Sequence, residues 1–368
     1  MKATILGAGN MGQSICFGME KLGYQITLID TSMDALKECD SRLEKDATLV
    51  STGVNEYLQI LKRVDYPDIM ISSLPFYENT AVAEYCIKRG IRYCDLGGNA
   101  DVSRKINDLA KAKASKPVMT DLGVAPGMVN MLTEHMYRQM TKEEGKNPET
   151  VKMMVGGIPR HAQQEDFFNY YCNWSIDGLL NEYMESCDIL ENGEITKVEP
   201  LTEYEVFETK SLGYVEAFNT SGGASHTIET LKRLGATNVC YKTIRWPGHA
   251  KTMTLLIKKC GLDRETMRKI LEKNCSLIPA EDCVMIMIVI DDKLQEILIP
   301  AEAGFSAMQR STGFSVACAA ALIGAGQYDG YKSIRYEDMS FEDFNLNMDV
   351  LIGTPKPEEG QEDDNELQ

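Results

Sequence analysis

Three glycines with the spacing G-x-G-x-x-G follow a short apolar run near the amino terminus. The run is Lys2 to Leu6, and the glycines lie in Gly7-Ala8-Gly9-Asn10-Met11-Gly12. Where such a loop opens a helix, it presents backbone N–H groups and the positive end of the helix dipole to a pyrophosphate. The first glycine allows a tight turn, the second lets the phosphates approach, and the third lets helix and strand pack closely. The stretch therefore predicts a dinucleotide site.

An acidic residue stands at the position where a dinucleotide-binding fold contacts ribose. Asp30 lies 18 residues beyond Gly12, at the end of a second predicted strand, Gln25 to Ile29. Its carboxylate can accept hydrogen bonds from both ribose hydroxyls of NAD, and it would repel the 2′-phosphate of NADP. Thr31 and Ser32 supply no cation that could offset this repulsion. We therefore expect NAD as the cofactor.

Strands alternate with helices through the first part of the chain, which predicts an α/β fold with a parallel, doubly wound sheet, a Rossmann domain. The further predicted strands are Ala47–Val50, Asp68–Ser73, Ile91–Cys94 and Pro117–Thr120. The predicted helices are Gln13–Leu22, Ser32–Asp40, Val54–Arg63, Glu78–Arg89, Asp101–Ala114 and Met128–Thr141. Ligands bind beyond the carboxyl ends of such strands, so loops 72–76, 95–99 and 121–128 should face the glycine loop across one crevice.

The residues expected at the cofactor lie in these loops. They are Gly7, Gly9, Asn10, Met11, Gly12, Asp30, Ser73, Leu74, Pro75, Asp95 and Asp121. For Asp121, capping of the turn before Pro126 is an equally good interpretation.

A second pattern begins near residue 150 and predicts a different sheet. Its strands are Val151–Gly156, Glu194–Val198, Tyr204–Glu208, Asn238–Arg245, Val284–Ile290 and Gln295–Ile299. Asn192-Gly193 is a hairpin signal, and the last two strands form a second probable hairpin. Gly313–Gly324 is apolar on nearly every side, which predicts a buried helix that returns to the first domain. We therefore predict a Rossmann domain over 1–127, completed by a helix over 311–326, and a substrate-binding domain over 128–310 and 331–353.

Composition excludes several classes of function. The net charge is −17 and 43% of residues are hydrophobic, which fits a soluble globular protein and argues against nucleic acid and anionic membranes as partners. Residues 354–368 hold six acids against one lysine and should form a disordered tail. The eleven cysteines are scattered, no apolar run reaches the ~20 residues of a membrane helix, and a strand opens the chain. We expect a cytoplasmic protein without a signal peptide.

Few groups in the second half suit catalysis. Four histidines without clustered ligands argue against a metal, and no G-x-S-x-G elbow supports acyl transfer. Gly222 and Gly223, which follow Thr220-Ser221, suit close approach to a ligand, although a plain loop is equally possible. Arg245 ends a predicted strand, where it can grip a carboxylate, and His249 can titrate near neutral pH. The alternatives are an ion pair for Arg245 and a helix cap for His249.

Taken together, the motifs resemble the saccharopine dehydrogenase family, and within it the L-lysine 6-dehydrogenases most closely. The resemblance runs from Met1 to about residue 330. It rests on Gly7-x-Gly9-x-x-Gly12, Asp95-Leu96-Gly97-Gly98-Asn99, Asp121-x-Gly123-x-Ala125-Pro126-Gly127-Met128-x-Asn130, Gly178-Leu179-Leu180-Asn181-Glu182-Tyr183, Glu216-Ala217-Phe218-x-Thr220-Ser221-Gly222-Gly223 and Lys242-Thr243-x-Arg245-x-Pro247-Gly248-His249. One departure is Trp246, where the family pattern leads us to expect tyrosine. We expect its added bulk and missing hydroxyl to lie beside the carboxylate grip.

The resemblance implies a Rossmann domain, a second α/β domain whose mixed sheet also builds a homodimer, and oxidation of a C–N bond. In the lysine enzymes NAD takes hydride from the ε-carbon, and water hydrolyses the imine to the semialdehyde and ammonia. We expect Arg245, Gly222, Gly223 and Asn130 to bind an amino-acid substrate, and Asp121 and His249 to act in catalysis. No metal is expected.

Two other functions remain open at this stage. A saccharopine or carboxyspermidine dehydrogenase would need a second cation for a second carboxylate, and Arg160 with His161 is the obvious candidate. A non-enzymatic, NAD-sensing regulator belongs to another class. It would need no substrate grip, so the intact stretches around Arg245 and Gly222 argue against it.

Overall fold

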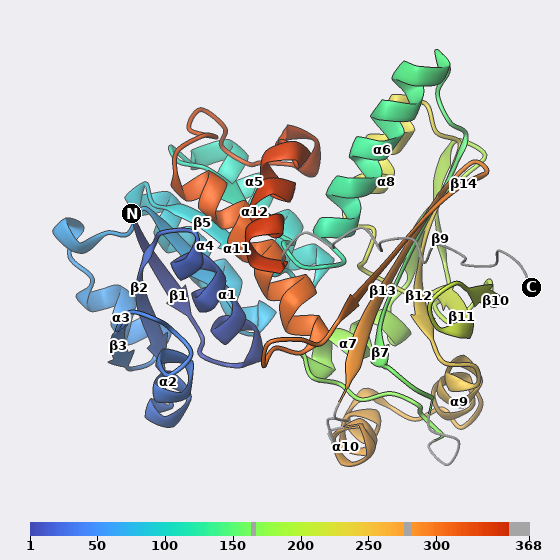
Figure 1. The fold of residues 1–368 in the computed structure, drawn as a ribbon, viewed down its shortest axis with the longest axis horizontal. Coiled ribbons are helices and arrows are strands. Elements are labelled where there is room, and N and C mark those ends of the chain that lie inside the picture. The colour runs from blue at the N-terminus through green and yellow to red at the C-terminus, as the bar shows by residue number, and fades with distance from the viewer. Residues whose placement is uncertain (163–166, 276–280, 353–368) are drawn as a thin grey trace, which may run out of the picture.

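Two sheets and the helices around them make up the molecule (Figure 1). The computed structural model describes residues 1–162, 167–275 and 281–352. The predicted acidic tail, 354–368, lies outside the described residues.

The first sheet is parallel and has six strands. These are β1 (Lys2–Leu6), β2 (Gln25–Asp30), β3 (Thr48–Ser51), β4 (Ile69–Ser72), β5 (Arg92–Asp95) and β6 (Val118–Met119). Their order is β3-β2-β1-β4-β5-β6, and every neighbouring pair is parallel. This is the order of a Rossmann sheet, so the predicted fold class is confirmed. The order reverses between β1 and β4, and a crevice opens there beyond the carboxyl ends of the strands.

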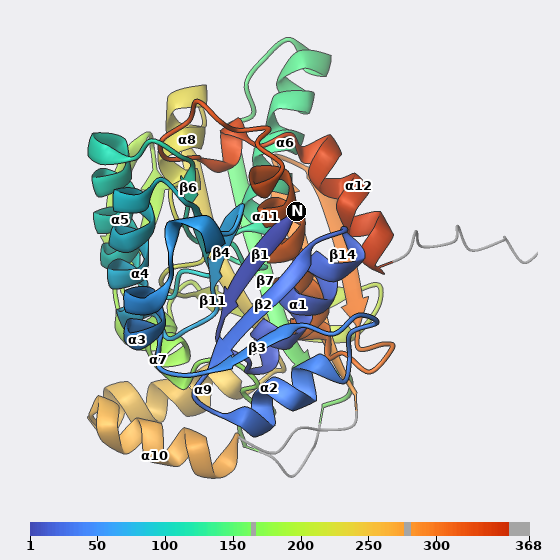
Figure 2. The ribbon, with the colours of Figure 1, turned by 90° about the vertical axis from the view of Figure 1, so that its left-hand side faces the viewer.

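Helices cover both faces of this sheet (Figure 2). One face packs against α1 (Asn10–Lys21), α2 (Met33–Asp40) and α11 (Phe314–Gly324). The other packs against α3 (Val54–Ile60), α4 (Phe76–Arg89) and α5 (Ala100–Lys113). Every residue of α11 is buried, as its uniformly apolar sequence predicts, and it lies against α1, β4 and β5. The return of this late helix to the first domain is therefore confirmed.

The second sheet is mixed and has eight strands. They are β7 (Thr150–Pro159), β8 (Cys187–Glu191), β9 (Glu194–Val198), β10 (Glu205–Thr209), β11 (Gly213–Asn219), β12 (Asn238–Arg245), β13 (Asp282–Ile290) and β14 (Lys293–Pro300). The main path is β10-β11-β12-β7-β13-β14, with β8 beside β12 and β9. Among the described strands of this sheet, only β12 and β7 pair in parallel. Both predicted hairpins are present. The sequence patterns gave no bounds for β8 and did not predict β11.

Helices α6 (Met128–Glu144) and α8 (Thr227–Leu234) pack on this second sheet. Helices α7 (Ile176–Met184), α9 (His249–Thr254) and α10 (Arg264–Asn274) form a separate apolar cluster, at the lower end in Figure 1. Shorter helical turns are η1 (Arg63–Asp65), η2 (Leu255–Lys259), η3 (Gln309–Gly313) and η4 (Tyr336–Asp338). None of the helices in the described part of the chain is long and apolar enough to cross a membrane.

The two domains share one continuous apolar core. It runs from β1 and α1 through α11 to α6, β7 and β13. Helix α12 (Phe341–Ile352) packs against α11, α1 and α6, so the segment assigned above to the second domain lies where the domains meet. Because apolar packing joins the domains, the loops of the first sheet are held in a fixed position relative to the second sheet.

Glu134 on α6 is a buried acid at this junction. Its Oε1 accepts a hydrogen bond of 2.8 Å from Thr227 Oγ1, while Oε2 has no hydrogen-bond donor among the described residues. Arg138 Nη2 lies 3.7 Å from Oε2. Burial raises the pKa of the Glu134 carboxyl from 4.5 to about 7.

We predict that Glu134→Gln removes a pH-dependent loss of stability. Between these two pKa values the folded chain keeps a proton on Glu134 that the unfolded chain releases. The contribution of Glu134 to the free energy of unfolding of the wild type therefore falls by about 3 kcal/mol as the pH rises. The difference in thermal midpoint, Glu134→Gln minus wild type, should therefore increase from about pH 5 to about pH 8. An equal difference in midpoint at both pH values would contradict this.

Candidate active site

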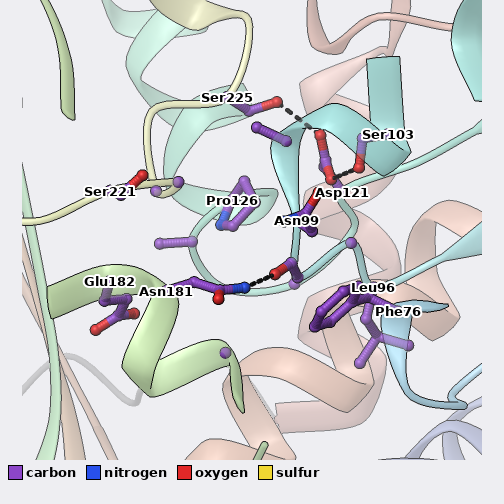
Figure 3. A pocket seen from close by; sticks show the side chains of 18 of the residues that line it. Phe76, Leu96, Asn99, Ser103, Asp121, Pro126, Asn181, Glu182, Ser221 and Ser225 are labelled. Atoms are coloured by element: carbon purple, nitrogen blue, oxygen red, sulfur yellow. Dashed lines mark hydrogen bonds between the residues drawn. The ribbon is translucent and has the colours of Figure 1, made fainter. Parts of the chain in front are cut away.

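A cavity of about 720 Å³ lies between the two domains (Figure 3). The first domain lines it with Met11 and with the three loops that follow β4, β5 and β6. The second domain lines it with residues of α7, the 221–223 loop and the end of β12. The predicted loops and the glycine loop thus border one cavity, beyond the carboxyl ends of the parallel strands.

The glycine loop has the shape that a pyrophosphate requires. Gly7 has a φ of +99°, and a Cβ on Gly12 would lie 1.9 Å from the Gly7 carbonyl oxygen. A Cβ on Gly9 would meet no described atom within 4 Å, so space in front of α1 is open. Within the described residues α1 also begins without a side-chain cap, and its first turn holds no acid. The loop therefore fits a bound dinucleotide phosphate.

Asp30 and Ser73 hold this loop from two sides. The Asp30 carboxylate accepts hydrogen bonds of 2.8 Å from the backbone N–H groups of Ala8 and Ser32. Ser73 Oγ donates to the carbonyl oxygens of Leu6 and Gly7, at 2.9 and 3.0 Å. Ser73 also lines the cavity, with Leu74 and Pro75 beside it.

Asp95 and Asp121 form a pair of buried carboxyls beside the cavity. Asp121 lines the cavity, whereas Asp95 lies outside the lining residues. Asp95 accepts from Tyr93 Oη and the Gly97 N–H, and burial together with the charge of Asp121 raises its pKa to about 7. Asp121 accepts from Ser103 Oγ at 2.5 Å and from Ser225 Oγ at 2.8 Å (Figure 3). Burial also raises the pKa of Asp121. Since Ser103 is on α5 and Ser225 precedes α8, Asp121 joins the two domains beside the cavity.

Arg245 lines the cavity from the second domain with its side chain only 3% exposed. Its Nε donates to Tyr183 Oη at 3.1 Å, and its Nη1 donates to the Ile244 carbonyl oxygen at 3.0 Å. The ring of Tyr170 lies beneath the guanidinium, 4.3 Å from ring centroid to Cζ. These contacts hold a permanent cation at the cavity wall, as a carboxylate grip requires.

His249 is buried behind this cation and does not line the cavity. Its Nδ1 lies 2.6 Å from the Phe168 carbonyl oxygen, and its Nε2 lies 3.0 Å from Tyr183 Oη. Burial and the charge of Arg245 lower the pKa of the imidazole to about 3. The ring is therefore neutral near pH 7, and it positions Tyr183 and through it Arg245.

Trp246 lies on the opposite side of the sheet from Arg245. Its indole Nε1 donates to the Pro159 carbonyl oxygen at 2.9 Å, and its ring packs in an apolar cluster with Ile244 and Met285. Successive side chains of a strand alternate between its faces, so the residue after Arg245 points away. The expectation that Trp246 adds bulk beside the carboxylate grip is wrong.

Asn130 positions the 221–223 loop and is fully buried. Its Oδ1 accepts from the Gly127 N–H, and its Nδ2 donates to the carbonyl oxygens of Gly223 and Ala224. Gly222, at φ +92°, and Gly223 line the cavity, and a Cβ on Gly223 would lie 2.2 Å from the Tyr241 ring. Asn130 thus acts on a ligand only through this loop.

Two family models cover nearly the whole chain. Residues 3–120 match the saccharopine dehydrogenase NADP binding domain, and residues 123–348 match the saccharopine dehydrogenase C-terminal domain. The chain belongs to the saccharopine dehydrogenase family. The family resemblance seen in the motifs is therefore confirmed, while the L-lysine 6-dehydrogenase subgroup stays a prediction.

Two relatives of this saccharopine dehydrogenase family member are similar to it over part of their length. Saccharopine dehydrogenase [NADP(+), L-glutamate-forming] of Schizosaccharomyces pombe is 24% identical over 238 residues, which are 62% of this chain and 51% of that protein. Alpha-aminoadipic semialdehyde synthase of Arabidopsis thaliana is 23% identical over 241 residues, 62% of this chain and 22% of that protein. The chain thus spans about half of one relative and less of the other.

Two solved structures share the fold over most of their length. Saccharopine dehydrogenase (L-Glu forming) from Saccharomyces cerevisiae has a TM-score of 0.67 at 15% identity and covers 94% of this chain and 96% of its own. Homospermidine synthase from Legionella pneumophila, in complex with NAD, has a TM-score of 0.71 at 13% identity and covers 100% and 95%. At these identities the likeness shows the fold alone.

Sequence reasoning missed the contribution of α7 to this family member's cavity. Glu182 Oε2 lies 3.5 Å from Arg245 Nη2, and Asn181 Nδ2 donates to the Gly98 carbonyl oxygen at 2.9 Å (Figure 3). The motif from Gly178 to Tyr183 marked the family, but no pattern linked it to a strand 60 residues later. Burial raises the pKa of Glu182 to about 7, against the effect of Arg245.

The second cation that the sequence suggested does not line the cavity. Arg160 lies outside the lining residues, and its Nη1 is buried without a hydrogen-bond partner among the described residues. Three other cations do line it: Arg104 and Lys111 on α5, and Arg335 before η4. Within the described ranges, no group of three or more His, Cys, Asp or Glu side chains could hold a metal ion.

We predict that Gly9→Ala weakens dinucleotide binding without destabilising the protein. Gly9 has φ −70° and ψ −172°, which alanine adopts freely, and the added methyl group would occupy the open space in front of α1. The Kd for NADH, from a fluorescence titration, should rise at least about tenfold, which is about 1.4 kcal/mol.

Gly53→Ala is the control, since Gly53 precedes α3 with a φ of −70° and lies outside the cavity lining. The atoms nearest to an added Cβ at Gly53 belong to the flexible Glu56 carboxylate, which can move aside. Its Kd should equal that of the wild type. Unchanged NADH binding by Gly9→Ala would contradict a phosphate site at this loop.

Proposed function

We propose that the protein is an NAD-dependent dehydrogenase that oxidises the ε C–N bond of L-lysine to 2-aminoadipate 6-semialdehyde with release of ammonia. The observation that carries this proposal is the position of Arg245. A buried, permanent cation stands on the cavity wall of the second domain, and the loops of the Rossmann sheet form the wall of the first domain. A substrate that fills the cavity can therefore place its carboxylate on Arg245 and its far end toward the cofactor.

NAD, when bound, would accept a hydride from the carbon that carries the amine. The chain has to hold and orient the reactants and to admit the water that hydrolyses the imine. The glycine loop and Asp30 hold the nucleotide, and Arg245 holds the carboxylate. L-lysine, NAD⁺ and water give the semialdehyde, NADH, ammonium and one proton, because water hydrolyses the imine once the C–N bond is oxidised. A cavity open to solvent suits that last step.

The charges around Arg245 favour L-lysine over saccharopine, which carries two more carboxylates. Glu182 stands beside Arg245 on α7, and Arg160 is outside the cavity lining. Each of the other three cations that line the cavity has an acidic neighbour. Arg104 pairs with Asp101, Lys111 lies close to Asp108, and Arg335 lies close to Glu229 and Glu337. An acidic wall stabilises a substrate with two amines better than one with three carboxylates.

A panel of substrates tests the proposal against both alternatives. Purified protein with NAD is incubated with L-lysine, saccharopine, carboxyspermidine and other ω-amino acids while NADH absorbance is followed at 340 nm. The proposal expects the highest kcat/KM with L-lysine. A higher kcat/KM with saccharopine or carboxyspermidine would show that this compound, and not L-lysine, is the substrate. Tight NADH binding without turnover of any amine would favour a regulator.

The choice of NAD over NADP is also a proposal, supported by the surroundings of Asp30. Its neighbours Thr31, Ser32 and, across the β2–β3 pair, Ser51 are all uncharged. A 2′-phosphate would meet the Asp30 carboxylate without a cation to balance it.

We predict that Asp30→Ala combined with Thr31→Arg shifts the ratio of kcat/KM values from NAD toward NADP. The double variant removes the repelling carboxylate and adds a donor for the phosphate. Thr31→Arg alone keeps the repulsion and should shift the ratio less. Tighter binding of NADP than of NAD by the wild type would contradict the proposal.

We predict that Arg245→Lys lowers kcat/KM for L-lysine by roughly 30-fold or more. An ammonium cannot present the two-pronged donor, and breaking a desolvated charge pair costs about 2–5 kcal/mol. The Kd for NADH should stay within a few-fold, because the glycine loop is untouched. 1,5-Diaminopentane, which lacks the carboxylate, should be turned over equally by both forms. Equal weakening of NADH and L-lysine would instead mark Arg245 as structural.

We further propose a cytoplasmic homodimer held by the second sheet. The family resemblance supports this, and the face of that sheet around β10 and β11 leaves Tyr204, Val206 and Tyr214 exposed. Light scattering at micromolar concentration should give twice the 41.1 kDa of the chain. A mass equal to a single chain would rule the dimer out. We expect no nucleic acid or membrane partner.

A further inference from the structure

Glu182 and Arg245 stand side by side on the cavity wall but form only a loose ion pair. Glu182 Oε2 lies 3.5 Å from Arg245 Nη2, and the two side chains are 19% and 3% exposed. An arginine and a carboxylate that pair for stability usually form two parallel hydrogen bonds at shorter distance. Here the guanidinium directs Nε to Tyr183 and one Nη1 hydrogen to Ile244. Both charged groups therefore keep hydrogen-bonding positions for a third partner.

The Glu182 carboxyl is a buried acid that the reaction proposed above leaves without a role. Among the described residues, Arg245 is its only hydrogen-bond or ion-pair partner. Burial raises its pKa to about 7, so the carboxylate gains from a cation that enters the cavity. Figure 3 shows Glu182 on the α7 wall next to Asn181, across from Phe76 and Leu96 of the first domain.

We propose that Glu182 binds the α-ammonium group of the substrate while Arg245 binds its α-carboxylate. The Glu182 carboxylate and the Arg245 guanidinium stand side by side. They therefore match the ammonium group and the carboxylate that one α-carbon carries. The pair would fix the amino-acid end as a zwitterion and direct the rest of the substrate toward the loops after β4, β5 and β6. The proposal rests on the function proposed above and names the group by which the site selects α-amino acids.

The same geometry separates Glu182 from the reacting carbon. If Arg245 holds the α-carboxylate, Glu182 lies beside the α-carbon, and four bonds of the substrate separate that atom from the ε-carbon. Glu182 is thus a specificity-determining residue and does not take the proton from the reacting amine. A role in proton transfer would instead affect every substrate alike.

The test compares ligands that differ only in the α-amine. 6-Aminohexanoate is L-lysine without this group. Glu182→Gln should lower kcat/KM for L-lysine by about 30-fold or more, since it removes the charge that faces the ammonium. For 6-aminohexanoate the change should stay within about threefold. Equal losses with both substrates, or no loss with L-lysine, would overturn the proposal.

A binding measurement keeps the test independent of turnover. L-Norleucine and hexanoate lack the ε-amine and differ from each other only in the α-amine. In calorimetry with the NADH complex, Glu182→Gln should raise the Kd for L-norleucine by about 30-fold. The Kd for hexanoate should change by less than about threefold. If the wild type fails to oxidise L-lysine but this difference appears, the reaction is wrong and the α-ammonium site stands. If the wild type oxidises L-lysine and the difference is missing, the reaction stands and the site is wrong.

Glu185→Gln is the matched control. Glu185 lies three residues further along, lines the same cavity, and forms no ion pair within the described residues. The variant removes the same charge from the same wall. It should change the kcat/KM ratio of L-lysine to 6-aminohexanoate, and the affinity ratio of L-norleucine to hexanoate, by less than about threefold. A loss specific to α-amino ligands that is as large in Glu185→Gln would assign the effect to the general negative field, and would overturn the proposal for Glu182.

Discussion

The burial of one guanidinium is the constraint on which the second domain is built. A cation out of water is tolerated only where fixed partners replace its hydration. Arg245 has a ring beneath it from Tyr170, a hydroxyl at Nε from Tyr183 and a loose carboxylate from Glu182. His249 fixes Tyr183 in turn through Nε2. Residues from α7, β12 and the start of α9 thus position the Arg245 guanidinium. This explains why several motifs from distant parts of the chain meet there.

The other wall of the cavity depends on close backbone contacts. Gly12 lets α1 pack on the Gly7 turn, and Ser73 ties the loop after β4 to the loop after β1. Hydrogen bonds across the junction, from Ser225 to Asp121 and from Asn181 to Gly98, then fix the distance between this wall and Arg245. Since hydride transfer requires the reacting carbon to meet the cofactor at one distance, a rigid junction supports the proposed chemistry.

Local rules made the first domain predictable from sequence. The glycine spacing, the alternation of strands and helices, and the acid after β2 each depend on residues close together in the chain. The uniformly apolar α11 was also predictable as a buried helix. In the second domain, β11, α7, α9 and α10 were not predicted, because segments this short give an ambiguous periodicity. The pairing of Glu182 with Arg245 depends on tertiary packing, and the orientation of Trp246 away from the cavity depends on where β12 ends. Sequence spacing alone encodes neither.

The central claim is that the protein uses NAD to oxidise the ε C–N bond of L-lysine and leaves the α-amine in place. Labelled nitrogen tests this directly. The protein is incubated with NAD and L-lysine that carries ¹⁵N only at the ε position, and the ammonium released is examined by NMR while NADH is counted. The account predicts one ¹⁵N-labelled ammonium ion for each NADH formed. Unlabelled ammonium would place the oxidation at the α-carbon, and NADH formed without ammonium would mean that a different bond is oxidised.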